Sequence, residues 1–338
     1  MINKLLLSFI GLFITSLLFS QTVNGVVLDA KSNQPIESVS IYFDNTTIGT
    51  TTDADGEFSI DYNESIKSLL IISHIGYFKS VIRDYSPSKK YKVLLEEDIN
   101  ILDEVIVTHD DGMPRKLKLS EFKKQFLGTS NNASSCKIIN DEDIILRYFT
   151  EEKQLTASSR KPIRIRNKNL QYIISYDLRD FKIDYSYVNI EKKQLHPKMV
   201  LYTGTSRYED LEKSHKNSVK KNRKKSYRGS SLHFLRALTA NNLKQEGYSL
   251  LKDGKTVNVE DYFFITQNKR SKAFNITLKD DVGIWRDGKV SALECKVDKF
   301  LVDQFGNHSP IDKVIFSGYM GSQRLGDSVP LNYKLIED

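Results

Sequence analysis

The sequence of 338 residues has few of the side chains from which metal-dependent active sites are built. None of its six histidines is followed by Glu three residues later, and no His-Glu-x-x-His is present. A catalytic zinc ion needs three protein ligands around an open position. The sequence therefore argues against a zinc peptidase, and it predicts no metal and no cofactor.

Two other common signatures of catalysis are also missing. There is no Gly-x-Ser-x-Gly, which carries the serine of α/β-hydrolases, and no Gly-rich loop that would cradle a phosphate. We therefore expect a protein that does not catalyse a reaction. The alternative is a hydrolase whose site is assembled in space within residues 115–338, with Tyr227, His233 and Arg236 as its polar side chains.

The sequence has only two cysteines, Cys136 and Cys295. An oxidising compartment would permit them to form a disulfide. Cys295 lies between Leu293 and Val297 on the apolar side of an alternating run, which suits a buried, unpaired thiol equally well. Spacing in the sequence leaves both alternatives open, because bridging depends on the distance between the two Cα atoms.

Long apolar runs are absent except at the N-terminus, where Leu5 to Phe19 follows a short positive start. A helix of that length rises about 22 Å, less than the roughly 30 Å of a bilayer core. The run therefore predicts a signal peptide over residues 1–20, cleaved between Ser20 and Gln21. No cysteine lies near this boundary, so lipid attachment there is excluded. We expect an exported protein, periplasmic or associated with the outer membrane, with no membrane span in the mature chain.

Charge is divided unevenly along the chain. Residues 22–108 carry a net charge of −7 and residues 109–338 a net charge of +13. Opposite charges would let the two parts attract each other, or would let the basic part face an anionic surface. Two independently solvated domains are the alternative.

The stretch from Gly49 to Phe58 predicts local structure most clearly. Its three threonines favour an extended backbone, and Asp53-Ala-Asp-Gly56 has the residues of a tight turn. From Phe58 the apolar residues alternate with polar ones, as in a strand with one buried face. We therefore predict a β-hairpin. A calcium loop starting at Asp53 is the alternative, but its sixth position, which needs Gly, is Phe58.

The sequence "VNGVVLDAKSNQPIESVSIYFDNTTIGTTTDADGEFSI" resembles the carboxypeptidase-like regulatory domain of Bacteroidetes envelope proteins. The matching positions are Gly25, Asp29, Pro35, Ile36, Val39, Gly49, Thr50, Thr52, Asp53, Gly56 and Phe58. The resemblance implies a seven-stranded, transthyretin-like β-sandwich over residues 22–96 and a location in the cell envelope. It does not imply peptidase activity, because in zinc carboxypeptidases the corresponding domain is an accessory to the catalytic one.

The segment Ile101 to Thr108 resembles the "LDEVVV" sequence that follows the same domain in TonB-dependent outer-membrane receptors. The remaining residues are too few for the plug and barrel of such a receptor, and they lack its repeated alternating strands. We therefore expect an edge strand and linker over residues 97–114. An accessory role in TonB-dependent transport is an alternative function.

Residues 115–338 predict a basic α+β domain with an antiparallel sheet, so the fold class is mainly β. A helix is expected from Ser120 to Leu127, and alternating strands at 163–165, 172–176 and 181–187. Asp253-Gly254 and Asp287-Gly288 predict two hairpins. The part weakly resembles an uncharacterised region that follows the same front domain in other Bacteroidetes proteins, and it brings no transferable activity.

The most unusual stretch is Lys213 to Arg228, with eight Lys or Arg and no acidic residue. A helix capped by Ser230 or Ser231 follows it, and a helix N-terminus attracts anions. The candidate anionic-ligand residues are Lys220, Lys221, Arg223, Lys224, Lys225, Tyr227, Arg228, His233 and Arg236. A solvated charged surface is the alternative.

We therefore expect an exported envelope protein that acts as a binding or assembly module. Its partner would be an envelope protein, an anionic glycan or lipopolysaccharide, and nucleic acid is not expected outside the cytoplasm.

Overall fold

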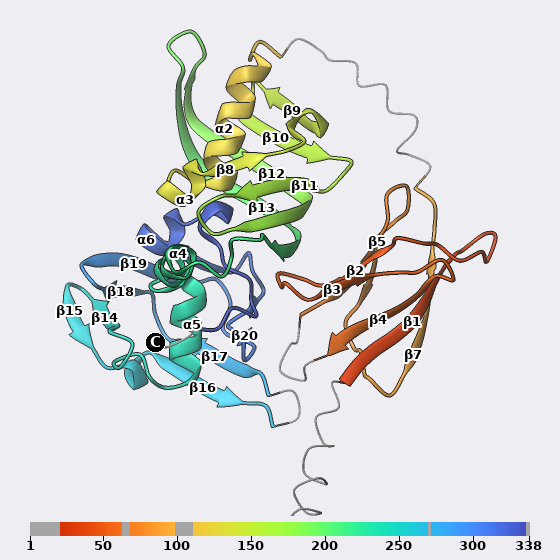
Figure 1. The fold of residues 1–338 in the computed structure, drawn as a ribbon. Helices are drawn as coiled ribbons and strands as arrows, with labels where there is room; N and C mark the ends of the chain where they lie inside the picture. Colours follow the sequence, from red (N-terminus) through yellow and green to blue (C-terminus); the bar gives the residue numbers. More distant parts are fainter. Residues whose placement is uncertain (1–20, 63–67, 99–110, 270–271, 336–338) are drawn as a thin grey trace, which may run out of the picture. The chain divides into compact units, whose positions relative to one another are not determined.

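The computed structural model describes residues 21–62, 68–98, 111–269 and 272–335, and these form mostly β-strands (Figure 1). The expected signal peptide and the segment Ile101 to Thr108 lie outside the described residues. The chain divides into two compact units. The described residues of the first unit end at Asp98, and Phe43–Thr47 and Ser68 group with the second unit. No helix among the described residues is long and apolar enough to cross a membrane.

The described residues of the first unit form the seven strands expected of the sandwich, arranged in two sheets. One sheet has the order β4-β1-β7 and the other the order β3-β2-β5-β6. The strands are β1 Gln21–Asp29, β2 Ser40–Phe43, β3 Gly49–Thr51, β4 Glu57–Tyr62, β5 Leu70–Ser73, β6 Ser80–Ile82 and β7 Lys90–Leu95. Strand β1 is central, since it pairs antiparallel with β4 and parallel with β7.

In the sheet β4-β1-β7, alternating residues bury one face. In β7 the buried residues are Tyr91, Val93 and Leu95, with Lys and Leu between them exposed. In β1 every second residue from Val23 is buried. Because successive side chains of a strand point to opposite faces, this period of two places the core between the sheets.

The turn at Asp53–Gly56 forms, but the prediction of a β-hairpin is wrong. Strand β3 pairs with β2, whereas β4 pairs with β1, so the turn carries the chain from one sheet to the other. The Gly56 amide donates to the Asp53 carbonyl at 3.0 Å, and the Glu57 amide donates to the Asp53 carboxylate at 2.8 Å.

The reason for this crossing is the buried residue Thr52. Its hydroxyl donates to the Ile36 carbonyl at 2.7 Å and accepts from the Val39 amide at 2.9 Å. These bonds hold the end of β3 against the segment before β2. The strand that follows the turn is therefore free to pair elsewhere.

The first part of the second unit is a six-stranded antiparallel sheet covered by helix α2. The sheet has the order β8-β11-β12-β10-β9, and β13 pairs with β12. The elements are α2 Arg115–Leu127, α3 Asn131–Ser134, β8 Cys136–Ile138, the 3-10 helix η3 Asp141–Asp143, β9 Ile144–Phe149, β10 Gln154–Ser159, β11 Ile163–Asn167, β12 Tyr172–Asn189 and β13 Gln194–Asp210. Helix α2 begins after Pro114 and not at Ser120, so the predicted start of this helix is wrong.

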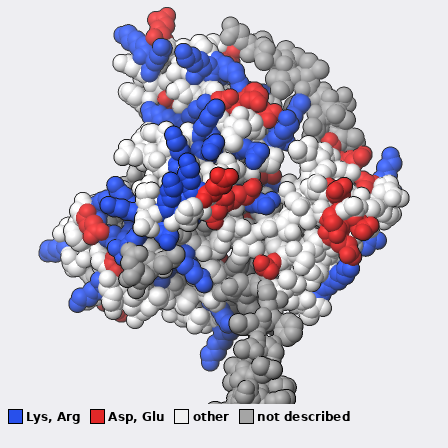
Figure 2. Space-filling view, in the orientation of Figure 1, with Lys and Arg blue, Asp and Glu red and all other residues white. Residues whose placement is uncertain are grey.

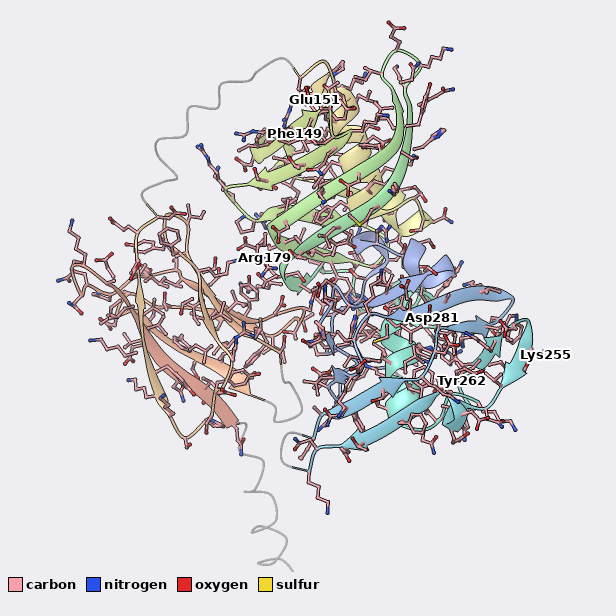
Figure 3. All side chains as sticks on the ribbon, turned by 180° about the vertical axis from the view of Figure 1, so that it is seen from behind. Phe149, Glu151, Arg179, Lys255, Tyr262 and Asp281 are labelled. Carbon is pink, nitrogen blue, oxygen red and sulfur yellow. The ribbon has the colours of Figure 1, made fainter. Side chains whose placement is uncertain are left out.

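The two strands expected at 172–176 and 181–187 are one continuous strand, β12. Its buried residues are Tyr172, Ile174, Tyr176 and Leu178 in the first half, and Phe181, Ile183 and Tyr185 in the second. A register shift between Leu178 and Asp180 changes the parity of the alternation. The side chain of Arg179, labelled in Figure 3, is 79% exposed at this bulge. The bulge therefore lets both halves of one long strand face the same core.

The second part of this unit has its own hydrophobic core, around helix α5. Its sheets have the orders β15-β14-β18-β19-β22 and β16-β17-β20-β21. The elements are α4 Asn217–Tyr227, α5 Ser231–Thr239, β14 Ser249–Lys252, β15 Lys255–Val257, the 3-10 helix η4 Val259–Asp261, β16 Phe263–Gln267, β17 Phe274–Leu278, β18 Val282–Arg286, β19 Lys289–Cys295, β20 Phe300–Val302, β21 His308–Ser309, β22 Val314–Ser317, α6 Gly318–Ser322 and the 3-10 helix η5 Leu325–Asp327.

Both predicted hairpins of this part are present. One joins β14 to β15 through Asp253-Gly254, and the other joins β18 to β19 through Asp287-Gly288. All four turn residues have a positive φ, between 49° and 76°. This is the conformation that two-residue hairpin turns require.

The two cysteines are free thiols in the structure, so of the two alternatives the unpaired one is observed. Cys136 belongs to the core of the first part of the unit and Cys295 to the core of the second. Burial, with a smaller contribution from Asp327, raises the pKa of the Cys136 thiol to about 12. This thiol therefore stays protonated at neutral pH.

Replacing Gly56 with Ala should destabilise the first unit. Gly56 has a φ of 71°, and an added Cβ would lie 2.5 Å from the Val27 carbonyl oxygen. The left-handed conformation alone costs a residue with a Cβ about 1–2 kcal/mol, and the close contact adds to this. Urea unfolding of the full chain measures the loss, with Ala54→Ser at an exposed position of the same turn as the control. Equal stability of the two variants would contradict the prediction.

Candidate functional site

The basic stretch forms the amphipathic helix α4. Its buried residues are Val219, Ser226 and Tyr227. The opposite face carries Lys220, Lys221, Lys224 and Lys225, which are exposed except for the half-buried Lys224. Figure 2 shows Lys and Arg side chains predominating on the visible face of the second unit. Because no acidic side chain lies between these lysines, their charges add, and this face of the helix carries a concentrated positive potential.

Arg223 lies on the side of α4 that faces the sheet, and its contacts are structural. Its guanidinium carbon lies 3.7 Å from the centre of the Tyr172 ring. The guanidinium donates to the Leu170 carbonyl at 2.8 Å, and it pairs with the Asp210 carboxylate at 2.6 Å. The side chain therefore anchors α4 to strand β12, and it is not available to a ligand in the way the lysines are.

Tyr227 and Arg236 lie in the interior beside the junction of α4 and α5. The Tyr227 ring packs against the rings of His233 and Tyr333, with ring centres 4.8 and 5.4 Å away. The Arg236 guanidinium donates to the carbonyls of Phe305, Tyr333 and Leu331, at 2.7, 2.9 and 2.5 Å. One N–H of each guanidinium nitrogen is therefore bonded to a carbonyl of the protein itself. Arg228 is exposed at the end of α4.

His233 is 2% exposed, and both of its ring nitrogens are occupied. The Gly229 amide can only donate, and it lies 3.1 Å from Nδ1, so Nδ1 is the unprotonated nitrogen. The Tyr248 hydroxyl also donates to Nδ1, at 2.8 Å. The proton is therefore on Nε2, which donates to Glu246 at 2.9 Å. Burial is the main cause that lowers the pKa of His233, while Glu246 opposes this shift.

The candidate residues therefore fall into two groups. The lysines of α4 form a surface, whereas Arg223, Tyr227, His233 and Arg236 serve internal contacts. Of the two predicted helix caps, Ser230 is the one used, because its hydroxyl accepts from the His233 amide at 3.1 Å. Sequence spacing alone could not separate the groups, since the partners of the internal residues come from distant segments.

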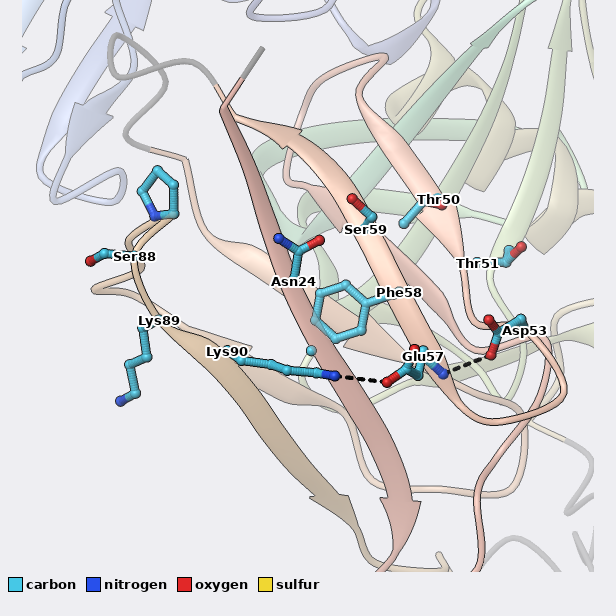
Figure 4. Close-up of a pocket in the computed structure, with 12 residues that line it drawn as sticks. Asn24, Thr50, Thr51, Asp53, Glu57, Phe58, Ser59, Ser88, Lys89 and Lys90 are labelled. Carbon is cyan, nitrogen blue, oxygen red and sulfur yellow. Dashed lines mark hydrogen bonds and ion pairs between the residues drawn. The ribbon is translucent and has the colours of Figure 1, made fainter. Parts of the chain in front are cut away.

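The first unit has a polar groove that sequence analysis did not predict. Its volume is about 700 Å³, and it lies beside β3, β4 and the turn before β7 (Figure 4). The lining includes Asn24, Thr50, Ser59 and Lys89, and a Lys90–Glu57 ion pair of 2.7 Å crosses it. Strands β3 and β4 each end their sheet among the described strands. The groove therefore lies between two strand edges, where backbone and side-chain hydrogen-bonding groups are accessible.

Comparison with known proteins concerns the first unit. The model of the family described as CarboxypepD_reg-like domain matches residues 23–107. A segment of 109 residues is 32% identical to part of the TonB-dependent receptor SusC of Bacteroides thetaiotaomicron. This segment covers 32% of the chain and 10% of the receptor, so the chain corresponds to about a tenth of that protein.

Among solved structures, a protein of unknown function from Bacteroides fragilis aligns over 88% of this chain and 92% of its own, with 8% identity and a TM-score of 0.17. A score this low supports no comparison of fold. The family match, the sequence identity to the receptor and the two-sheet architecture agree on the first unit. Residues 23–107 of this chain therefore belong to the CarboxypepD_reg-like domain family, a transthyretin-like fold.

Proposed function

We propose that this chain is an exported cell-envelope protein that binds or assembles with other envelope components and catalyses no reaction. The observation that carries the proposal is the segment shared with a TonB-dependent receptor, at 32% identity over 109 residues. TonB-dependent outer-membrane receptors carry the kind of domain that residues 22–96 resemble, so the shared segment supports an envelope location. In this chain the domain precedes a basic unit of a different fold.

The first unit supports binding through its edges. The groove of about 700 Å³ lies beside β3 and β4, which end their sheets among the described strands. A strand at the end of a sheet can accept an extended segment of a partner through main-chain hydrogen bonds. The polar lining around Asn24 and Ser59 would add side-chain contacts.

The second unit supports binding through charge. The lysine surface, defined as Lys220, Lys221, Lys224 and Lys225, has no ion pair with the acidic side chains of the described residues. Lysine near an anionic surface contributes about 1 kcal/mol of attraction, which salt screens. The partner would be an acidic envelope protein, an anionic glycan or the phosphates of lipopolysaccharide.

A hydrolase in the second unit is the alternative, and the cluster around His233 bears on it. A general base must accept a proton from a nucleophile. Here Nδ1 accepts hydrogen bonds from the Gly229 amide and from the Tyr248 hydroxyl, whose pKa burial raises further above its usual value of 10. In our proposal the cluster is a structural connection between α5 and the segment before β14. An accessory role in TonB-dependent transport would be compatible with the same envelope location.

Location and partners test the proposal most directly. Crosslinking in intact cells of the source organism, followed by identification of the crosslinked proteins, should recover the chain with envelope proteins. Recovery with a TonB-dependent receptor would support the transport accessory role specifically. A chain that fractionates with the cytoplasm, crosslinked to cytoplasmic proteins, would contradict the proposal.

Replacing all four residues of the lysine surface with Gln should weaken association with outer-membrane vesicles by about tenfold or more. The effect should be larger at low salt, because screening is weaker there. The control replaces the exposed Lys116, Lys192, Lys193 and Lys198, which changes the net charge equally. Co-sedimentation measures both. If the two variants lose the same affinity, net charge alone explains the binding, and the lysine surface has no special role.

Replacing His233 with Gln should lower the free energy of unfolding by about 1–3 kcal/mol, since buried hydrogen bonds are lost. The pKa of His233 lies below 6.5 in the folded chain, so the unfolded chain takes up the proton first. Stability of the unaltered protein should therefore be full above pH 6.5 and fall as the pH drops from there towards the folded-state pKa.

The variant should show a shallower fall over this range in urea unfolding between pH 7.5 and pH 4.5. Burial also lowers the pKa of His308, to about 4, so a residual slope is expected. The exposed His196→Gln serves as the control. An unchanged slope in the His233 variant would exclude the proposed structural connection.

A further inference from the structure

The second unit contains a cavity of about 320 Å³ that neither the lysine surface nor the His233 cluster explains. Four segments provide most of its lining: β12 at Tyr176, β13 from Tyr202 to Tyr208, the junction of α4 and α5, and the segment from α6 to Val329. Asn45 and Ile311 complete it. The volume lies at the lower end of the range for small-molecule sites. None of the four lysines lines it.

Tyr176 is the first sign that the cavity is a binding site. The residue is 7% exposed and lines the cavity, yet its hydroxyl has no hydrogen-bond partner among the described residues. Its ring is held edge-on against Phe126, with centres 5.0 Å apart. Gly204 leaves room for the ring, because a Cβ there would lie 2.6 Å from it. The hydroxyl oxygen is not among the fully buried, unpartnered atoms of the described residues, so it is open to the cavity, where an occupant could bond it.

The first turn of α5 contributes further donors. The cap Ser230 accepts from the His233 amide, which leaves the earlier amides of Ser231 and Leu232 without an intrahelical acceptor. Both of these residues line the cavity. The start of a helix of nine residues also carries a partial positive charge. The Ser231 hydroxyl adds one more group that can donate.

Arg324 supplies a full positive charge to the same cavity. Its Nη1 donates to the Gly321 carbonyl at 2.5 Å and to the Gln323 carbonyl at 3.5 Å, whereas its Nε and Nη2 have no partner among the described residues. Asp327 is the acidic residue of the lining. One of its oxygens accepts from the Ser130 hydroxyl at 2.7 Å and from Asn132 at 3.2 Å. The free groups of the cavity are therefore mostly donors, with one carboxylate oxygen left to accept.

From this arrangement we infer that the cavity binds a small anion, carboxylate or phosphate, on a hydroxylated body of about one sugar ring. The anionic group would take the donors of Arg324, the α5 amides and the Tyr176 hydroxyl. A hydroxyl of the body would donate to Asp327, and apolar side chains such as Leu232 and Met320 would contact its carbon atoms. This inference goes beyond the proposed function and uses different residues from the lysine surface, so either can fail without the other.

Titration calorimetry of the full chain with D-glucuronate, inorganic phosphate and D-glucose tests the inference. Glucuronate or phosphate should bind, and glucose should bind at least tenfold more weakly. Binding of glucuronate alone identifies a sugar acid as the ligand class, and binding of phosphate alone identifies a phosphate group. Absence of binding by both anions at millimolar concentrations, or equal binding of glucose, would overturn the inference.

Two variants locate the binding. Tyr176→Phe removes only the hydroxyl and should weaken anion binding about tenfold, and Arg324→Gln should weaken it more, because hydrogen bonds to a charged group are the stronger ones. Tyr185→Phe is the matched control: Tyr185 is a buried residue of the same strand with an unpartnered hydroxyl, and it does not line the cavity. If Tyr176→Phe and Arg324→Gln bind the anion as tightly as Tyr185→Phe, the cavity is not the site.

Discussion

The contact between Arg223 and Tyr172 organises the part of the second unit that carries the lysine surface. A guanidinium 3.7 Å from the ring centre, bonded to the Leu170 carbonyl and paired with Asp210, holds α4 against strand β12. Because the helix cannot rotate about its axis, four lysines face outward and Tyr227 faces inward. The same orientation brings the start of α5 to the cavity. In the sequence, Arg223 looks like one more residue of the basic surface. In the structure it is the residue that positions the lysine surface.

The polar groups of this unit illustrate how burial decides a role. Both ring nitrogens of His233 and all three guanidinium nitrogens of Arg236 bond to the protein itself, so the two side chains stabilise the connection of α5 with its surroundings. Tyr176 and Arg324 retain free donors at a cavity. A group whose hydrogen bonds are satisfied within the protein contributes to stability, whereas a donor left free at a cavity can bond a ligand. This difference, more than residue type, separates the structural cluster from the inferred site.

The first unit relates the chain to part of a TonB-dependent receptor and also offers a surface of its own. Its family match covers residues 23–107, and its groove lies beside two strands that end their sheets. Strand edges and a polar groove favour recognition of an extended segment of a partner, whereas the lysine surface favours an anionic partner. A protein with both features is suited to holding components of the envelope together, in agreement with the proposed function.

Local patterns in the sequence determined much of the fold. The period of two in β1 and β7 reflects sheets with one buried face, and Asp253-Gly254 and Asp287-Gly288 form hairpins because few other residues accept a positive φ at both positions. The Ser230 cap follows from a hydroxyl placed before an apolar helix. Each of these features depends on residues only a few positions apart.

Tertiary structure alone decided the features that depend on distant partners. Thr52 diverts the chain between sheets because its hydroxyl bonds Ile36, and the bulge at Leu178–Asp180 joins two expected strands because both halves pack on one helix. The cavity brings together Tyr176, Ser231 and Arg324, which no spacing rule connects. Sequence periodicity indicates which face of a helix or strand is apolar. Only the packing of the folded chain determines which residues that face contacts, and whether a hydrogen-bond donor on it finds a partner.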